Sequence, residues 1–183
     1  MDAHQRLVAL LRSRSLKTGD FVLTSGKRSS WYIDCRRTTM HAEGLALVGE
    51  LGLAAIRAAG WTADAVGGMT LGADPVAYAI ALASYAHPPT IHGFTVRKAA
   101  KEHGMGRRIE GCFESGAMVV VIEDSITTGG SALSAIEAVR AEGGIVTGVL
   151  AVVDRGEGGR EAIEKAGVSV RALVAASELL GAS

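Results

Sequence analysis

The sequence feature that most constrains the fold is an uninterrupted apolar run at residues 118–122, followed at once by two acidic residues and a loop of Thr, Gly and Ser. A continuous run of Val and Ile is typical of a strand that is covered on both faces, as in the parallel sheets of α/β proteins. Residues 130–141 then carry a helical pattern that ends at two glycines. The segment therefore predicts a buried strand, a tight loop and a helix.

Strand-like and helix-like segments alternate through most of the chain. Apolar runs predict strands at residues 31–34, 65–67, 91–96, 145–153 and 168–174, and amphipathic or alanine-rich segments predict helices at residues 3–14, 41–59, 75–85 and 161–166. Such alternation implies right-handed crossovers and an α/β fold with an open, mainly parallel sheet flanked by helices. Because the chain has 183 residues and no linker-like segment, we expect one domain over residues 1–183.

Charge and hydropathy exclude several classes of protein. Nineteen Lys and Arg balance nineteen Asp and Glu, so we expect no general nucleic-acid binding, which needs a basic surface. No apolar segment reaches the roughly 18 residues of a membrane span, and the charged N-terminus does not resemble a signal peptide. Cys35 and Cys112 are too few for a disulfide framework or a four-ligand zinc site. We therefore expect a cytoplasmic protein without a membrane partner.

The loop after the acidic pair has the chemistry of a phosphate site. Backbone N–H groups at a helix N-terminus are unpaired and lie at the positive end of the helix dipole. The hydroxyls of Thr128 and Ser131 can add donors. Glu123 and Asp124 would repel a phosphate and fit better as acceptors for a neutral diol, so ribose 5-phosphate is the predicted ligand. The structural alternative is an acidic helix cap before a flexible turn; Walker A and G-x-G-x-x-G patterns are absent.

A second candidate feature is a basic stretch at residues 97–108. It holds five Lys or Arg and one His, together with two glycines. A run of charges is often only a solvated surface. Beside a ribose-phosphate site, however, a cationic loop could close over a departing diphosphate and neutralise its developing charge.

Several segments together resemble the type I phosphoribosyltransferases, and within them the orotate-specific branch. The sequence IEDSITTGGS at residues 122–131 resembles the phosphoribosyl-diphosphate signature of the whole family. The pattern Arg-Lys-x-x-Lys-x-His-Gly at residues 97–104 resembles the catalytic loop of the orotate branch, and residues 21–34, 72–75 and 154–155 support the same branch. The resemblance extends from about residue 16 to residue 174.

The resemblance implies a type I phosphoribosyltransferase-like fold with a small N-terminal hood in about residues 1–40. It implies an orotate phosphoribosyltransferase activity, in which the 5-phosphoribosyl group of 5-phosphoribosyl 1-diphosphate is transferred to orotate. The products are orotidine 5′-phosphate and diphosphate, in de novo pyrimidine (UMP) biosynthesis. It further implies Mg²⁺ as a cofactor, held mainly by the substrate, and a homodimer whose loop residues are shared between subunits.

The resemblance also assigns residues to each part of the substrates. Residues matching diphosphate contacts are Arg97, Lys98, Lys101 and His103. Residues matching the ribose-phosphate site are Glu123, Asp124, Ser125, Ile126, Thr127, Thr128, Gly129, Gly130 and Ser131. Residues matching orotate contacts are Thr127, Arg155, Tyr32 and Ile33. Among these, Lys98, Lys101, His103 and Asp124 are the expected catalytic residues.

The chain departs from the family pattern at Thr24 and Val76, because many relatives carry lysines at these two places. Lys27 or Arg28 are candidates to replace the missing charge. Two other functions also fit the phosphate loop. A purine-type phosphoribosyltransferase would share the loop but turn over a purine, and a non-catalytic regulator would bind nucleic acid in response to the sugar diphosphate.

Overall fold

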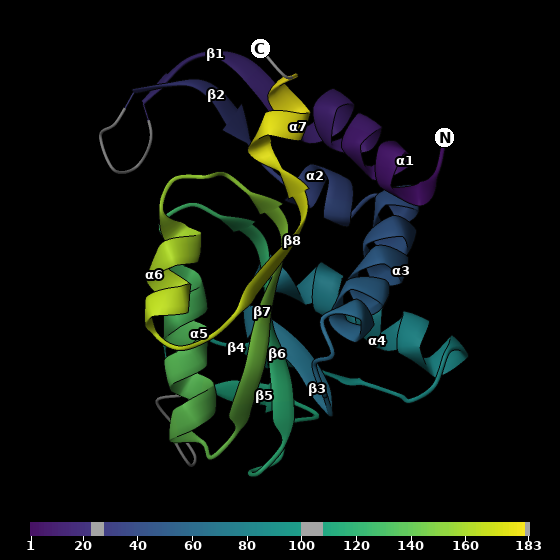
Figure 1. Ribbon diagram of the computed structural model, residues 1–183, viewed down its shortest axis with the longest axis vertical. Helices are drawn as coiled ribbons and strands as arrows, with labels where there is room; N and C mark the ends of the chain where they lie inside the picture. Colours follow the sequence, from purple (N-terminus) through teal and green to yellow (C-terminus); the bar gives the residue numbers. More distant parts are fainter. Residues whose placement is uncertain (23–27, 100–107, 182–183) are drawn as a thin grey trace.

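The computed structural model describes residues 1–22, 28–99 and 108–181. Within them, a central sheet has the strand order β5-β4-β3-β6-β7-β8 (Figure 1). Its strands are β3 (Ala65–Met69), β4 (His92–Val96), β5 (Ile109–Gly111), β6 (Met118–Ile126), β7 (Ile145–Asp154) and β8 (Val170–Ala175). All neighbouring strands pair in parallel except β5, which is antiparallel to β4. The predicted open, mainly parallel sheet is confirmed.

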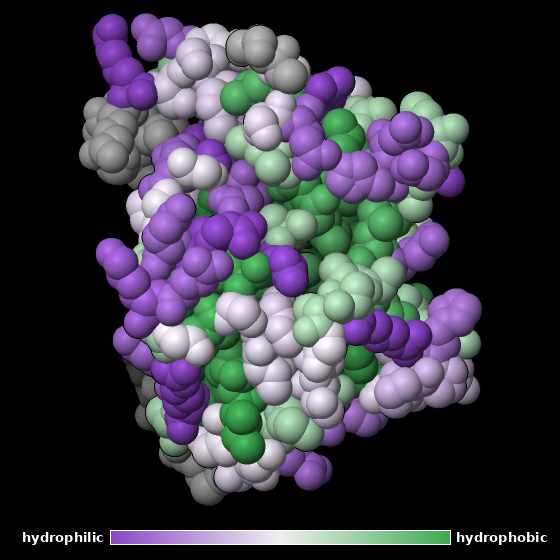
Figure 2. Space-filling view, viewed as in Figure 1, coloured by the Kyte–Doolittle hydropathy of each residue, from purple (hydrophilic) through white to green (hydrophobic). Residues whose placement is uncertain are grey.

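Helices cover both faces of this sheet (Figure 1). They are α1 (Ala3–Leu10), α2 (Arg36–Thr39), α3 (Ala42–Ala58), α4 (Ala73–Ala86), α5 (Gly130–Ala141), α6 (Gly159–Lys165) and α7 (Ala176–Leu180), with a π-helical turn at Leu11–Ser15. None of the helices in the described ranges is long and apolar enough to cross a membrane. Figure 2 shows apolar residues reaching the surface between β8 and α3, surrounded by polar and charged residues.

The apolar run of β6 is continuous because each face of the strand contributes to a separate core. Val120 and Ile122 pack in the cluster formed with α1, α3 and α4, whereas Val119 and Val121 pack in the cluster formed with α5 and α6. Successive side chains on a strand point to opposite faces, so both sets must be apolar when both faces are covered. This arrangement fixes β6 at the centre of the molecule and holds the loop that follows it.

A second, two-stranded antiparallel sheet is formed by β1 (Leu16–Val22) and β2 (Arg28–Ile33). It lies at the end of the molecule where β8 leads into α7, above the carboxyl ends of the parallel strands (Figure 1). Contacts between the chain ends lie beside it: His4 Nε2 is 2.8 Å from Glu178 Oε2, and Arg12 Nε donates to the Leu179 carbonyl oxygen at 3.1 Å. The two-stranded sheet therefore lies over the edge of the main sheet where parallel α/β proteins bind ligands.

Candidate functional site

Three loops leave the carboxyl ends of neighbouring strands at one edge of the sheet. Residues 70–72 lead from β3 into α4, residues 127–129 lead from β6 into α5, and residues 155–158 lead from β7 into α6. The loops after β6 and β7 are aligned, because Ile126 pairs with Asp154 and the Arg155 N–H donates to the Ile126 carbonyl oxygen at 3.0 Å. The predicted acidic pair, the Thr-Gly loop and Arg155 therefore share this edge.

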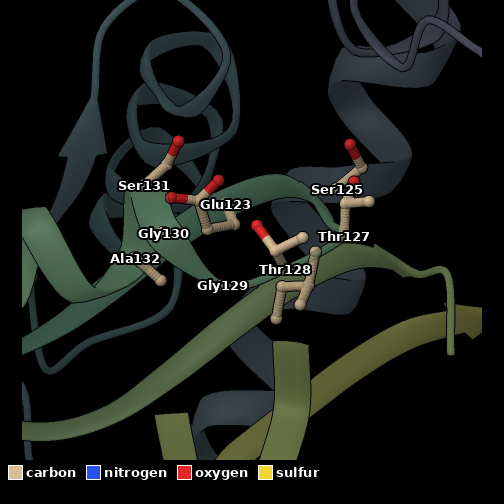
Figure 3. Close-up of a pocket in the computed structure, with 9 residues that line it drawn as sticks. Glu123, Ser125, Thr127, Thr128, Gly129, Gly130, Ser131 and Ala132 are labelled. Atoms are coloured by element: carbon tan, nitrogen blue, oxygen red, sulfur yellow. The ribbon is translucent and has the colours of Figure 1, made fainter. Parts of the chain in front are cut away.

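The loop after β6 encloses a pocket of about 190 Å³ (Figure 3). Its lining residues are Glu123, Ser125, Ile126, Thr127, Thr128, Gly129, Gly130, Ser131 and Ala132. Figure 3 shows the side chains of Glu123 and Ser131 together on one side of the pocket and those of Ser125 and Thr127 on the other. Every predicted ribose-phosphate residue except Asp124 lines this one pocket. Its hydroxyls and helix N-terminus suit an anion.

Gly129 allows two loops to approach each other closely. It is the N-cap of α5 and has a left-handed φ of 81°. A Cβ atom at this position would lie 2.8 Å from the Gly159 carbonyl oxygen, and a Cβ atom on Gly159 would lie 2.6 Å from the Thr127 carbonyl oxygen. The pocket loop and the start of α6 therefore pack backbone against backbone, which only glycine permits.

Glu123 is a buried acid inside this pocket. Its Oε1 atom has no hydrogen-bond partner in the described part of the chain. Burial first, and the negative charge of Asp124 second, raise the pKa of Glu123 to about 8. At neutral pH the side chain is therefore protonated, and it can lie beside a phosphate without repelling it and can donate a hydrogen bond.

Asp124 faces away from the pocket, because successive residues of a strand alternate. Its carboxyl group packs against Gly72, where a Cβ atom would lie 2.7 Å from the Asp124 Cγ atom. The Ser125 N–H donates to Asp124 Oδ1 at 2.8 Å, and burial raises the pKa of Asp124. The two predicted acids therefore act in different surroundings: Glu123 beside the phosphate loop and Asp124 beside the loop that follows β3.

The loop after β3 is held by a small hydrogen-bond network. Asp74 accepts from the Thr70 hydroxyl at 2.7 Å and from the Thr95 hydroxyl at 2.8 Å.

Val76, one of the two departures from the family pattern, is buried in the core cluster of α1, α3 and α4. An uncharged residue therefore suits this position. The other departure, Thr24, lies outside the described residues.

Arg155 is a buried cation at this edge, with a side chain only 5% exposed. Its guanidinium carbon lies 4.1 Å from the ring centroid of Trp31, and its Nε donates to Glu157 Oε1 at 2.7 Å. Its Nη2 atom has no hydrogen-bond partner among the described residues. No sequence pattern indicated a role for Trp31, because 124 positions separate it from Arg155 in the chain and leave no local signal of the contact.

The predicted base contacts Tyr32 and Ile33 differ in their surroundings. Ile33 is buried in the core, whereas Tyr32 is partly exposed and its ring lies 5.9 Å from that of Phe21.

In the basic stretch, Arg97 pairs with Glu110 at 3.4 Å and Lys98 is exposed. The predicted residues Lys101 and His103 lie outside the described residues.

Comparison with known proteins gives a consistent result over nearly the full chain, although no protein-family model matches it. The orotate phosphoribosyltransferase of Aquifex aeolicus is 48% identical over 179 residues, which cover 96% of this chain and 97% of that protein. The enzyme of the same name from Corynebacterium glutamicum is 46% identical over 179 residues, covering 98% and 95%. The crystal structure of Mycobacterium tuberculosis orotate phosphoribosyltransferase with 5-phospho-α-D-ribosyl 1-diphosphate has a TM-score of 0.83 at 40% identity, covering 98% of this chain and all of the other.

Proposed function

The chain belongs to the orotate phosphoribosyltransferase family, and on this premise we propose how its residues transfer a 5-phosphoribosyl group from 5-phosphoribosyl 1-diphosphate to orotate. The products are orotidine 5′-phosphate and diphosphate, and the reaction is a step of pyrimidine biosynthesis. The observation that carries the residue assignment is that the pocket within residues 123–132 and the enclosed guanidinium of Arg155 lie at the same edge of the sheet, on loops joined by the bond from the Arg155 N–H to the Ile126 carbonyl oxygen.

The 5-phosphate of the sugar binds in the pocket after β6. Backbone N–H groups at the start of α5 and the hydroxyls of Thr128 and Ser131 donate to it. A protonated Glu123 lies beside the phosphate and the sugar ring without charge repulsion. Asp124 lies on the other side of the strand, next to Gly72. We assign it to the ribose diol, whose hydroxyls it accepts from on the side where the diphosphate binds.

The diphosphate is bound by the cations of the basic stretch, Arg97, Lys98, Lys101 and His103, and we assign catalysis to Lys98, Lys101, His103 and Asp124. Breaking the bond between C1 of the ribose and the diphosphate oxygen leaves a centre with oxocarbenium character and puts the electron pair on the diphosphate. Cations stabilise that developing charge. The orotate nitrogen forms the new bond to C1 and its proton passes to the departing diphosphate, so the protein mainly positions the reactants and excludes water.

The orotate carboxylate pairs with Arg155, since a guanidinium binds a carboxylate through two parallel hydrogen bonds. The unpartnered Nη2 atom supports this assignment. Thr127 directly follows Ile126, whose carbonyl oxygen accepts from the Arg155 N–H, and we assign it to the same base. Because Ile33 is buried, we assign its contact to the backbone, and Tyr32 supplies a side chain.

We propose that Mg²⁺ enters with the substrate, bound to its diphosphate. The described residues include no group of three or more His, Cys, Asp or Glu that could hold a metal ion. Mg²⁺ commonly keeps several waters and binds mostly to substrate phosphates, so such a group is unnecessary. When bound, the ion supplies charge neutralisation on the diphosphate.

The turnover of orotate tests this function. Purified protein with 5-phosphoribosyl 1-diphosphate, Mg²⁺ and orotate should deplete the absorbance of orotate, whereas adenine and hypoxanthine should not react. Turnover of a purine without turnover of orotate would support a purine-type enzyme instead. Binding of nucleic acid that depends on the sugar diphosphate, without any turnover, would support a regulator.

Replacing Asp124 by asparagine tests the ribose assignment. We expect the KM for 5-phosphoribosyl 1-diphosphate to rise about tenfold, because a charged hydrogen-bond acceptor is lost, while the KM for orotate stays within about twofold. Steady-state kinetics with each substrate varied in turn would measure both constants. An unchanged KM for the sugar diphosphate would contradict the contact between Asp124 and the diol.

An apolar stripe on α4 supports a homodimer. Tyr78, Leu82 and Tyr85 are 52%, 73% and 77% exposed, and their spacing places them on one face of the helix. A contiguous apolar face on a soluble protein commonly marks an interface.

The two cysteines, Cys35 and Cys112, are free thiols. Free thiols are typical of a reducing compartment, so they support the cytoplasm as the location of this protein.

Replacing Leu82 by glutamate is expected to convert the dimer into a monomer, because the charge would have to be buried in the interface. Light scattering after size-exclusion chromatography would measure the mass. Ile145→Glu is the matched control, since Ile145 is also exposed, at 55%. It is the first residue of β7, at the amino ends of the parallel strands, whereas the candidate active site lies at their carboxyl ends. A Leu82→Glu protein that keeps the mass of a dimer would place the interface elsewhere.

A further inference from the structure

The contact between Trp31 and Arg155 joins the two-stranded sheet to the edge that carries the proposed site. Trp31 lies on β2, and Arg155 directly follows β7. The guanidinium carbon of Arg155 lies 4.1 Å from the centroid of the indole ring. At this distance a planar guanidinium is attracted by the face of the ring, both by its charge and by stacking.

Only some of the N–H donors of the Arg155 guanidinium have acceptors among the described residues. A guanidinium has five N–H donors. The Nε donor is used by Glu157 at 2.7 Å, whereas the buried Nη2 atom has no partner among the described residues. A buried donor without an acceptor is costly, so the arrangement favours a ligand that supplies one. Trp31 thus covers the face of the guanidinium and Glu157 holds its Nε, which leaves the buried Nη2 without an acceptor until that ligand supplies one.

We propose that Trp31 is a positioning residue for the acceptor substrate: its indole face fixes the plane of the Arg155 guanidinium, so that the outer nitrogens meet the substrate carboxylate in the plane that two parallel hydrogen bonds need. An arginine side chain has several rotatable bonds, and a free guanidinium would have to be ordered at each binding event. Stacking on Trp31 and the bond to Glu157 order it beforehand. This inference rests on the proposed function, in which Arg155 binds orotate.

The experiment compares two ligands that differ only in the carboxylate, orotidine 5′-phosphate and uridine 5′-phosphate. Titration calorimetry gives the dissociation constant of each for the full-length protein and for Trp31→Leu and Trp31→Phe. For Trp31→Leu we expect the dissociation constant of orotidine 5′-phosphate to rise about tenfold and that of uridine 5′-phosphate to stay within about twofold. Trp31→Phe keeps an aromatic face and should stay within about threefold of the unchanged protein for both ligands. If Trp31→Leu does not fold in a thermal melt, Trp31→Met takes its place.

The outcomes separate this inference from the proposed function. Equal weakening of both ligands by Trp31→Leu would mean that the indole contacts the base or only supports the fold, and would overturn the inference. An unchanged preference for orotidine 5′-phosphate in Trp31→Leu would also overturn it. Arg155→Gln should abolish the preference, and adding Trp31→Leu to it should change neither constant further. If the unchanged protein itself shows no preference for the carboxylate, the proposed function fails instead.

Discussion

Replacing Gly129 by alanine is expected to raise the KM for 5-phosphoribosyl 1-diphosphate about a hundredfold. Gly129 has a left-handed φ, and an added Cβ would lie 2.8 Å from the Gly159 carbonyl oxygen and 3.3 Å from a side-chain carbon of Ile163. The carbonyl oxygen belongs to a backbone that cannot rotate away, so the loop after β6 must move. A displacement of about 1 Å in groups that position a substrate can cost a hundredfold. Steady-state kinetics and thermal melting would measure the effect.

Gly167→Ala is the matched control for this substitution. Gly167 has nearly the same left-handed φ, 80°, but nothing lies within 4 Å of an added Cβ. It therefore carries only the conformational strain, roughly 1 kcal/mol of stability, and the KM should stay within about twofold. If both variants raised the KM equally, the close approach of Gly129 to Gly159 would not be the cause.

The part of the fold that the sequence predicts correctly is the part determined by local patterns. The strand and helix within residues 118–141 could be predicted because a strand covered on both faces has a continuous apolar sequence, whatever elements pack against it. β1 was not predicted. Its sequence, LKTGDFV, is polar and contains glycine, and it forms a strand because β2 pairs with it. Strand formation of this kind depends on a partner rather than on intrinsic propensity.

The residues of the candidate site can be predicted from the sequence more readily than their surroundings. The lining of the phosphate pocket comes from one short segment of the chain, Glu123 and residues 125–132, so its chemistry could be predicted from residues 123–131. Glu123 and Asp124 point to opposite faces of the sheet because successive side chains of a strand alternate, and this could be predicted. Which of the two faces the phosphate loop depends on the helix that packs on that face of the sheet, and this could not. The contact between Trp31 and Arg155 depends on the position of the two-stranded sheet over the main sheet, which no local pattern encodes.

Replacing Glu123 by glutamine is expected to stabilise the protein, and to do so more strongly as the pH rises from 5 to 9. In the unfolded chain Glu123 ionises near its ordinary pKa of 4.5, whereas in the folded protein burial raises its pKa to about 8. Between these values the folded state binds a proton that the unfolded state has lost, so the free energy of unfolding of the unchanged protein falls as the pH increases. Glutamine mimics the protonated acid and lacks this dependence.

The difference in free energy of unfolding between Glu123→Gln and the unchanged protein should grow from about 1 kcal/mol at pH 5 to roughly 4–5 kcal/mol at pH 9, with most of the change complete near pH 8. Urea unfolding at pH 5, 7 and 9 would measure it. Glu137→Gln, on the exposed surface of α5, is the control and should differ from the unchanged protein by less than about 0.5 kcal/mol at every pH. A gap for Glu123→Gln that stays constant with pH would mean that Glu123 is ionised throughout. The phosphate pocket would then hold a permanent negative charge, and the sugar phosphate could bind there only if a cation neutralised it.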